Sequence, residues 1–451
     1  MPDTPAATLL PLDHPALEAA CLRALEIAKA RGASDAEAET SASIGQNVTV
    51  RLGEVETVEY NRDKGLSVTV YFGERRGNAS TSDLSDAAIV QAVEAACAIA
   101  RHTAPDPAAG LPDEKRLFRG EAGDLDLWHP WNLSVEAAID LARRTEAAAR
   151  GVDRRIANSE GATVSSWDAD FVLANSRGFV GGYAGSRASV GCGVIAAEGE
   201  AMQRDYWYTA ARDPSLLEAG EAVGRRAGER ALARLAARRV ATAEVPVLFE
   251  APVAGSLVGH FVSAASGSSL YRRSSFLLDA AGKPVFSPCV TIREDPHVPG
   301  GLASGRFDGE GVATSARDIV AAGVLTGYFL SSYSARKLGL ETTGNAGGSH
   351  NLSVAPGEDD FAALLARMGR GLVVTELMGQ GVNAVTGDYS RGAVGFWVEG
   401  GEIRYPVEEV TIAGSLPAMY RDIVAVGRDV VQRGARTTGS ILVGRMTVAG
   451  S

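Results

Sequence analysis

The stretch Gly371–Pro406, GLVVTELMGQGVNAVTGDYSRGAVGFWVEGGEIRYP, decides how the second half of this chain folds. It begins with the apolar run Leu372–Val374, which is typical of a buried strand. The closely spaced glycines that follow favour tight, bent backbone rather than helix. Ala393–Glu399 and Glu402–Pro406, separated by Gly400–Gly401, then predict two strands joined in a hairpin. The stretch therefore predicts a glycine-rich β-domain.

Polar side chains lie between these glycines, at Asp388, Tyr389, Ser390 and Arg391. Functional sites often consist of polar residues on a constrained loop. A salt-bridged loop at the corner of a β-barrel is the other interpretation of the same residues. Residue chemistry alone leaves both interpretations open.

Three segments together resemble one known family. They are ELMGQGVNAVTGDYSRGAVGFWVEGGEI at 376–403, SSYSARKLGL at 331–340 with TGNAGG at 343–348, and GHFVSAASGSSLYRRSSFLLD at 259–279. In this order they resemble the PmbA/TldE proteins of the TldD/PmbA family. The resemblance covers the C-terminal half densely and the N-terminal half more loosely.

The resemblance has a consequence for metal binding. The sister proteins of the TldD type carry His-Glu-x-x-x-His in a helix that binds zinc, with a cysteine near the C-terminus. Here the matching helix has Gly259, His260 and Ala264 at the positions of the first histidine, the glutamate and the second histidine, and residues 431–451 contain no cysteine. The resemblance therefore implies a TldE-type chain that holds no zinc itself.

The function implied by the resemblance is that of a non-catalytic subunit in a cytosolic TldD/TldE-type metalloprotease, which degrades or trims unfolded or extended peptides. A TldD-type partner would supply zinc, and this chain would form part of the substrate chamber. We expect its wall to include these residues: Tyr271, Arg272, His350, Asp388, Tyr389 and Arg391. Surface salt bridges at Arg272 and loop capping at His350 are the alternatives.

The fold expected from the whole chain is α+β in two domains. Residues 1–240 predict helices packed on antiparallel sheets, with a turn at Asn61–Gly65. Residues 241–451 predict a glycine-rich, β-barrel-like domain with a few helices, one of them starting near Pro252. This second domain carries the family segments and the degenerate metal motif.

Composition narrows the class of protein. The chain has 451 residues and a formal net charge of −11, without clustered Lys or Arg, so a nucleic-acid surface is not expected. The cysteines Cys21, Cys97, Cys192 and Cys289 are too far apart for a CxxC motif, and free thiols are typical of a reducing cytosol. We see neither a signal peptide nor an apolar run long enough to span a membrane. A cytoplasmic location is therefore expected.

Other chemistries find little support in the sequence. No HExxH, Gly-x-Ser-x-Gly or P-loop motif occurs. His260, His297 and His350 could still converge in space on a metal outside the family pattern. Two further functions stay open: an autonomous homodimeric protein that binds peptides or modulates another enzyme, and a hydrolase with an unrecognised site.

Overall fold

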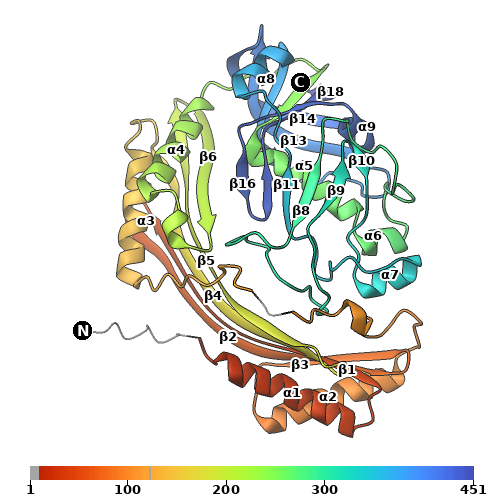
Figure 1. Ribbon diagram of the computed structural model, residues 1–451. Helices are drawn as coiled ribbons and strands as arrows, with labels where there is room; N and C mark the ends of the chain where they lie inside the picture. Colours follow the sequence, from red (N-terminus) through yellow and green to blue (C-terminus); the bar gives the residue numbers. More distant parts are fainter. Residues whose placement is uncertain (1–9, 121–122, 451) are drawn as a thin grey trace.

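The computed structural model describes residues 10–120 and 123–450. Its first half is built on a six-stranded antiparallel sheet in the order β3-β2-β1-β4-β5-β6. The strands are β1 (Asp35–Arg51), β2 (Glu54–Phe72), β3 (Arg75–Thr81), β4 (Asn158–Asn175), β5 (Val180–Glu198) and β6 (Ala201–Ala211). In Figure 1 this strongly curved sheet runs along the left and lower side of the molecule.

Four helices cover one face of this sheet: α1 (His14–Ala30), α2 (Asp86–His102), α3 (Val135–Arg150) and α4 (Gly220–Ala233). Along β1, Ala36 and Ala38 pack in the core with α1 and α2, and Val48 and Val50 pack in the core with α3 and α4. These four residues are an even number of positions apart, so their side chains point to one face of the strand. The helices lie on the convex side, and the concave side turns toward the second half of the chain (Figure 1).

The predicted turn at Asn61–Gly65 is wrong, because these residues lie inside β2. There Asn61 pairs with Gly45 and Asp63 with Ser43, without a break in register. The side chains of residues 54–64 are exposed, so no apolar alternation marks this part of the strand. Backbone hydrogen bonds to the long β1 outweigh the local turn preference of these polar residues.

The second half contains a closed barrel. The order β14-β13-β12-β7-β18 closes through a β14–β18 pairing, and β15 extends from β18. The strands are β7 (Ala243–Phe249), β12 (Arg370–Met378), β13 (Asp388–Glu399), β14 (Glu402–Ser415), β15 (Ile423–Val426) and β18 (Ile441–Ala449). Gly400 and Gly401 form the turn between β13 and β14, as predicted, both with positive φ.

A second sheet of shorter strands packs beside the barrel in the order β10-β9-β8-β11-β17-β16. Its strands are β8 (Ile292–Asp295), β9 (Arg317–Ala321), β10 (Val324–Leu325), β11 (Asn351–Val354), β16 (Val431–Arg433) and β17 (Arg436–Thr438). The helices of this half are α5 (Ala251–Ala264), α6 (Gly267–Tyr271), α7 (Ser332–Leu338), α8 (Phe361–Met368) and α9 (Leu416–Arg421). The predicted α+β class with a β-barrel is thus confirmed. The domain boundary near residue 240 stays a prediction.

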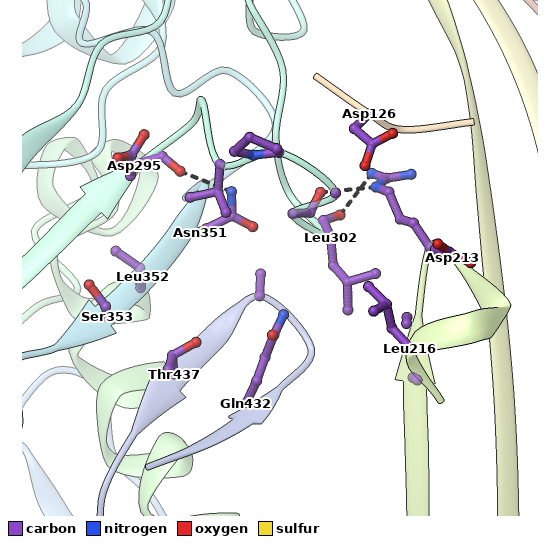
Figure 2. Close-up of a pocket in the computed structure, with 18 of the residues that line it drawn as sticks. Asp126, Asp213, Leu216, Asp295, Leu302, Asn351, Leu352, Ser353, Gln432 and Thr437 are labelled. Carbon is purple, nitrogen blue, oxygen red and sulfur yellow. Dashed lines mark hydrogen bonds between the residues drawn. The ribbon is translucent and has the colours of Figure 1, made fainter. Parts of the chain in front are cut away.

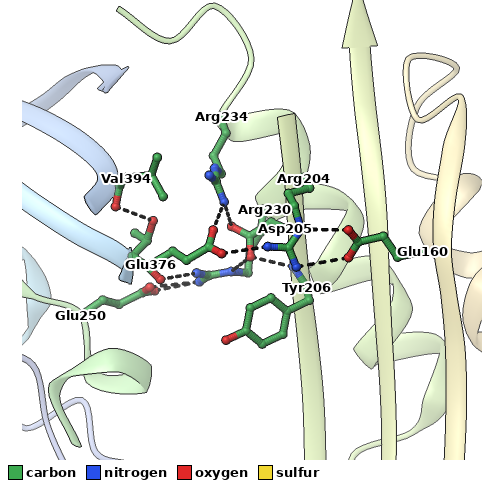
Figure 3. A network of polar contacts seen from close by, with 10 residues as sticks. Glu160, Arg204, Asp205, Tyr206, Arg230, Arg234, Glu250, Glu376 and Val394 are labelled. Atoms are coloured by element: carbon green, nitrogen blue, oxygen red, sulfur yellow. Dashed lines mark hydrogen bonds and ion pairs between the residues drawn. The ribbon is translucent and has the colours of Figure 1, made fainter. Parts of the chain in front are cut away.

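A network of ion pairs joins the two halves (Figure 3). Its members are Arg204, Arg230, Arg234, Glu160, Asp205, Glu250 and Glu376. The Arg234 side chain, which is only 7% exposed, lies 2.6 Å from Glu376 on β12 and 3.5 Å from Asp205 on β6. Arg230 of α4 reaches Glu250, the residue before α5, at 3.0 Å. These contacts hold α5 and β12 in place against α4 and β6.

The structure bears on membrane spans and cysteines, and it does not describe the residues at the N-terminus. Among the described residues, no helix is long and apolar enough to cross a membrane. Residues 1–9, on which the expectation about a signal peptide rests, lie outside the described residues. The four cysteines are free thiols, three of them buried: Cys21, Cys97 and Cys192.

Candidate functional site

The candidate site is built on α5, the helix that carries Gly259, His260 and Ala264. Proline at the second position, Pro252, suits the first helical turn, whose N–H groups lack intrahelical partners. One face of α5, including Leu257 and Phe261, lies in the barrel core. Gly259 lies on the opposite side of the helix and His260 at the flank of the core face; both are half-exposed, whereas Ala264 is buried.

Arg436, from the strand β17, lies directly against Gly259 of α5. A Cβ atom built on Gly259 would stand 3.0 Å from the Nη1 atom of Arg436 and 3.2 Å from its Cζ. Arg436 begins β17, whose hairpin with β16 packs on α5. The guanidinium thus takes the space that a longer side chain at position 259 would need.

His260 contacts a second strand of the barrel. Its ring stands edge-on to the ring of Tyr389, with centroids 5.8 Å apart. Burial, followed by the positive charges of Arg391 and Arg436, lowers the pKa of His260 below its usual 6.5. The imidazole is therefore neutral at pH 7. Its Nε2 atom is buried and has no hydrogen-bond partner among the described residues.

Tyr389 and Arg391 reach this site from β13, so the loop expected at residues 388–391 is wrong: these residues pair with β14. Tyr389 and Arg391 are two positions apart and so point to the same face of the strand, which also carries the core residue Ala393. Tyr389 is 1% exposed, and burial raises the pKa of its hydroxyl to about 12. Within the described chain, neither the Tyr389 hydroxyl nor the Arg391 Nε atom has a hydrogen-bond partner.

Three of the residues predicted from the sequence, His260, Tyr389 and Arg391, therefore come together, and the structure adds Arg436. Sequence reasoning missed Arg436, because nothing in the pattern of residues 431–438 distinguishes it from other surface arginines. Only the return of the β16–β17 hairpin onto α5 brings it to Gly259.

The other predicted wall residues lie apart from this group. Tyr271 packs edge-on against Tyr333, at 5.7 Å between ring centroids, in a pocket of about 280 Å³. Arg272 donates from Nε to the Tyr271 hydroxyl at 3.2 Å. Asp388 is exposed and accepts a hydrogen bond from Thr386 Oγ1 at 2.6 Å.

His350 holds two loops together. Its Nε2 atom lies 2.8 Å from the carbonyl oxygen of Gly344, and its Nδ1 atom lies 3.3 Å from that of Ala303. His297 instead lies 3.1 Å from the Thr314 hydroxyl. The structure does not bring His260, His297 and His350 together as metal ligands: across residues 10–120 and 123–450, no three His, Cys, Asp or Glu residues are grouped to hold a metal ion.

A cavity of about 330 Å³ lies between β6 of the first half and β11, β16 and β17 of the second (Figure 2). Its lining includes three carboxylates, those of Asp126, Asp213 and Asp295. Both β6 and β16 are the last strands of their sheets. Arg433 of β16 donates to the carbonyl oxygen of Tyr208 on β6 at 3.0 Å. The cavity thus lies between two free strand edges that one arginine bridges.

Comparison with known proteins identifies the family. Three family models match in sequence order: PmbA/TldA metallopeptidase domain 1 at residues 36–100, the central domain at 128–235 and the C-terminal domain at 242–450. The chain belongs to the TldD/PmbA family. Within it, metalloprotease PmbA of Escherichia coli O157:H7 is 51% identical over 96% of both chains. The PmbA homologue of Haemophilus influenzae is 47% identical over 98% of both. The chain is therefore of the PmbA/TldE type.

More distant relatives match in sequence or in structure. A TldD homologue, also from Haemophilus influenzae, is 24% identical over 80% of this chain and 79% of its own. A crystal structure from Bacteroides thetaiotaomicron, described as a candidate modulator of DNA gyrase, superposes with a TM-score of 0.91 at 27% identity over 96% of this chain and 99% of that one. TldE from Thermococcus kodakarensis gives 0.84 at 20% identity, over 94% and 99%.

Proposed function

We propose that this chain is the non-catalytic subunit of a TldD/TldE-type metalloprotease acting on unfolded or extended peptides. In this proposal a TldD-type partner supplies zinc and the glutamate base, and bond cleavage takes place there. This chain holds no zinc and forms part of the substrate chamber. Both chains work in the cytoplasm, in keeping with the free thiols.

The observation that carries the proposal is the position of Arg436. Gly259 stands where the TldD-type motif has its first histidine, and the Arg436 guanidinium fills the space beside it. A cation at that place would repel a zinc ion, and a histidine side chain would have to displace it. His260, at the glutamate position, is a neutral imidazole and lacks the carboxylate that activates water in the TldD-type motif.

Similarity to a TldD homologue supports the proposal that the partner chain is of the TldD type. Haemophilus influenzae has both a PmbA homologue and a TldD homologue, and this chain resembles both along most of its length. Two chains of one fold, one with and one without metal ligands, suit a pair in which one subunit performs the chemistry.

The free strand edges support a role in holding peptide. An extended peptide can bind by adding a strand to an open sheet edge, using main-chain hydrogen bonds that ignore sequence. The edges of β6 and β16 flank the cavity in Figure 2, and Gln432 of β16 and Leu216 beside β6 line it. A peptide bound in this way must be unfolded, because its own backbone groups have to be free.

The test is purification of the tagged chain from its own cells, with mass spectrometry of the proteins that accompany it. We expect a stoichiometric second chain of similar length carrying His-Glu-x-x-x-His. Recovery of this chain alone, as a stable homodimer, would contradict the heteromeric assembly and favour an autonomous binding protein.

A further inference from the structure

The half-exposed face of α5 is surrounded by polar groups without partners. Within the described residues, four buried atoms here make no hydrogen bond: Ser256 Oγ, His260 Nε2, the Tyr389 hydroxyl oxygen and Arg391 Nε. Ser256 and His260 are one turn apart on α5 and lie on the same side of the helix. Buried polar atoms are nearly always paired in native structures, so four in one place indicate a missing partner.

The charge at this site is also unbalanced. Arg436 lies beside Gly259, and its pKa is lowered by burial, with no neighbouring carboxylate or hydrogen bond acting on it in the described part of the chain. The half-buried Arg317, by contrast, lies 3.0 Å from the carboxylate of Glu294. A desolvated guanidinium is unfavourable unless an anion or several acceptors compensate it. Among the described residues, no carboxylate pairs with the Arg436 guanidinium.

We propose that Arg391, Arg436, His260 and Tyr389 form a carboxylate-binding site on the face of α5. Guanidinium groups match the two oxygens of a carboxylate with paired N–H donors. The neutral imidazole and the un-ionised phenol add one donor each. All four groups can donate, and the anion would supply the acceptors that the protein lacks.

The carboxylate is that of an extended peptide, either its C-terminus or an Asp or Glu side chain; this identification rests on the proposed function. Ala435 and Thr437, the neighbours of Arg436, line the cavity between the two strand edges. Side chains alternate along a strand, so Arg436 points to the other face of the same hairpin. The carboxylate site and the proposed peptide cavity thus lie on the two faces of one hairpin, and the choice of a peptide over a free phosphate rests on the proposed function and is decided by the probes below.

The experiment measures binding to the isolated full-length chain by calorimetry, using three probes. They are acetyl-trialanine with a free carboxylate, the same peptide as C-terminal amide, and acetyl-Ala-Glu-Ala amide; inorganic phosphate is titrated as a competing anion. We expect one or both carboxylate probes to bind and the neutral amide not to bind. The free acid alone would identify a C-terminal carboxylate, and the glutamate peptide would identify a side chain.

Matched arginine variants locate the site. Arg436→Gln and Arg391→Gln each remove a charged donor and should weaken carboxylate binding about tenfold or more. Arg445→Gln, at an exposed arginine on β18, should leave it unchanged. Thermal unfolding of each variant shows whether the fold is kept. Arg436→Lys is used where the Gln variant does not fold. Its loss of carboxylate binding should be smaller than that of Arg436→Gln, because lysine keeps the positive charge and loses only the forked pair of donors.

Three results would overturn the proposal: equal binding of the neutral amide, binding unchanged in both site variants, or binding of inorganic phosphate with no binding of either carboxylate probe. Because no partner chain is present, these results are independent of whether a TldD-type subunit co-purifies. Failure of this site and failure of the proposed function can therefore be told apart.

Discussion

The guanidinium of Arg436 lies beside Gly259, so close that a Cβ on residue 259 would stand 3.0 Å from Arg436 Nη1. The contact joins β17 to α5 across a long separation in sequence. Glycine at position 259, although a poor helix former, leaves room for the guanidinium at this place.

Gly259→Ala tests this contact. Alanine favours the helix by about 1 kcal/mol, and only the end of a flexible arginine must move, so we expect little change in the free energy of unfolding. Carboxylate binding should weaken, because the guanidinium is displaced. The control is Gly224→Ala in α4, where a Cβ would stand 1.9 Å from the carbonyl oxygen of Thr145 and should destabilise strongly. Equal destabilisation in both variants, measured by urea unfolding, would contradict the account.

Rebuilding the TldD-type motif on α5 should fail. In the triple variant Gly259→His, His260→Glu and Ala264→His, the first histidine meets Arg436 and the second enters the core, where Ala264 is 1% exposed. We expect no bound zinc by elemental analysis and a loss of stability of roughly 2 kcal/mol or more from the buried imidazole. Stoichiometric zinc in a stable triple variant would show that α5 is not blocked.

The ion-pair network predicts a large effect from one substitution. Arg234→Met removes a buried cation and leaves Asp205 and Glu376 without that partner. Breaking a buried pair in this way costs about 3–5 kcal/mol. Arg23→Met, which removes an exposed arginine paired with Asp86, should cost less than about 1 kcal/mol. Comparable unfolding free energies for the two variants would mean that the network does not hold the halves together.

Glu37 gives the protein a dependence on pH. Burial, and then the charge of Glu310, raises the pKa of Glu37 from 4.5 to about 7. The folded state therefore keeps a proton that the unfolded state loses, so this group makes stability fall as pH rises from 4.5 to 7. Glu37→Gln should remove that fall. The free energy of unfolding of the variant, compared with that of the wild type, should therefore rise by up to about 3 kcal/mol between pH 4 and pH 8. A difference between the two proteins that does not vary with pH would exclude this role.

Short sequence patterns predicted the elements that depend on neighbouring residues only. The Gly400–Gly401 hairpin and the start of α5 at Pro252 follow from glycine and proline chemistry, and both are in the structure. The continuity of β2 through Asn61–Gly65 could not be predicted, because it depends on pairing with a strand that lies on the far side of a turn.

Three residues of the site were predicted from the sequence, and one was not. His260, Tyr389 and Arg391 stood out in the sequence, and packing of α5 against β13 unites them. Arg436 carries no local signal, and its role depends on a hairpin that returns to α5 from 177 positions beyond Gly259 (436 minus 259). A contact of that kind can be seen only once the chain is folded.

The division of labour between the two chains is tested by peptide hydrolysis in a reconstituted pair. The chain is assayed on an unfolded peptide alone, with the TldD-type chain of the same genome, and with that chain after both histidines of its His-Glu-x-x-x-His motif are changed to alanine. We expect hydrolysis only by the intact pair, and unchanged hydrolysis when this chain carries Arg445→Gln. Chelator-resistant hydrolysis by this chain alone, or by the pair with the altered motif, would contradict it.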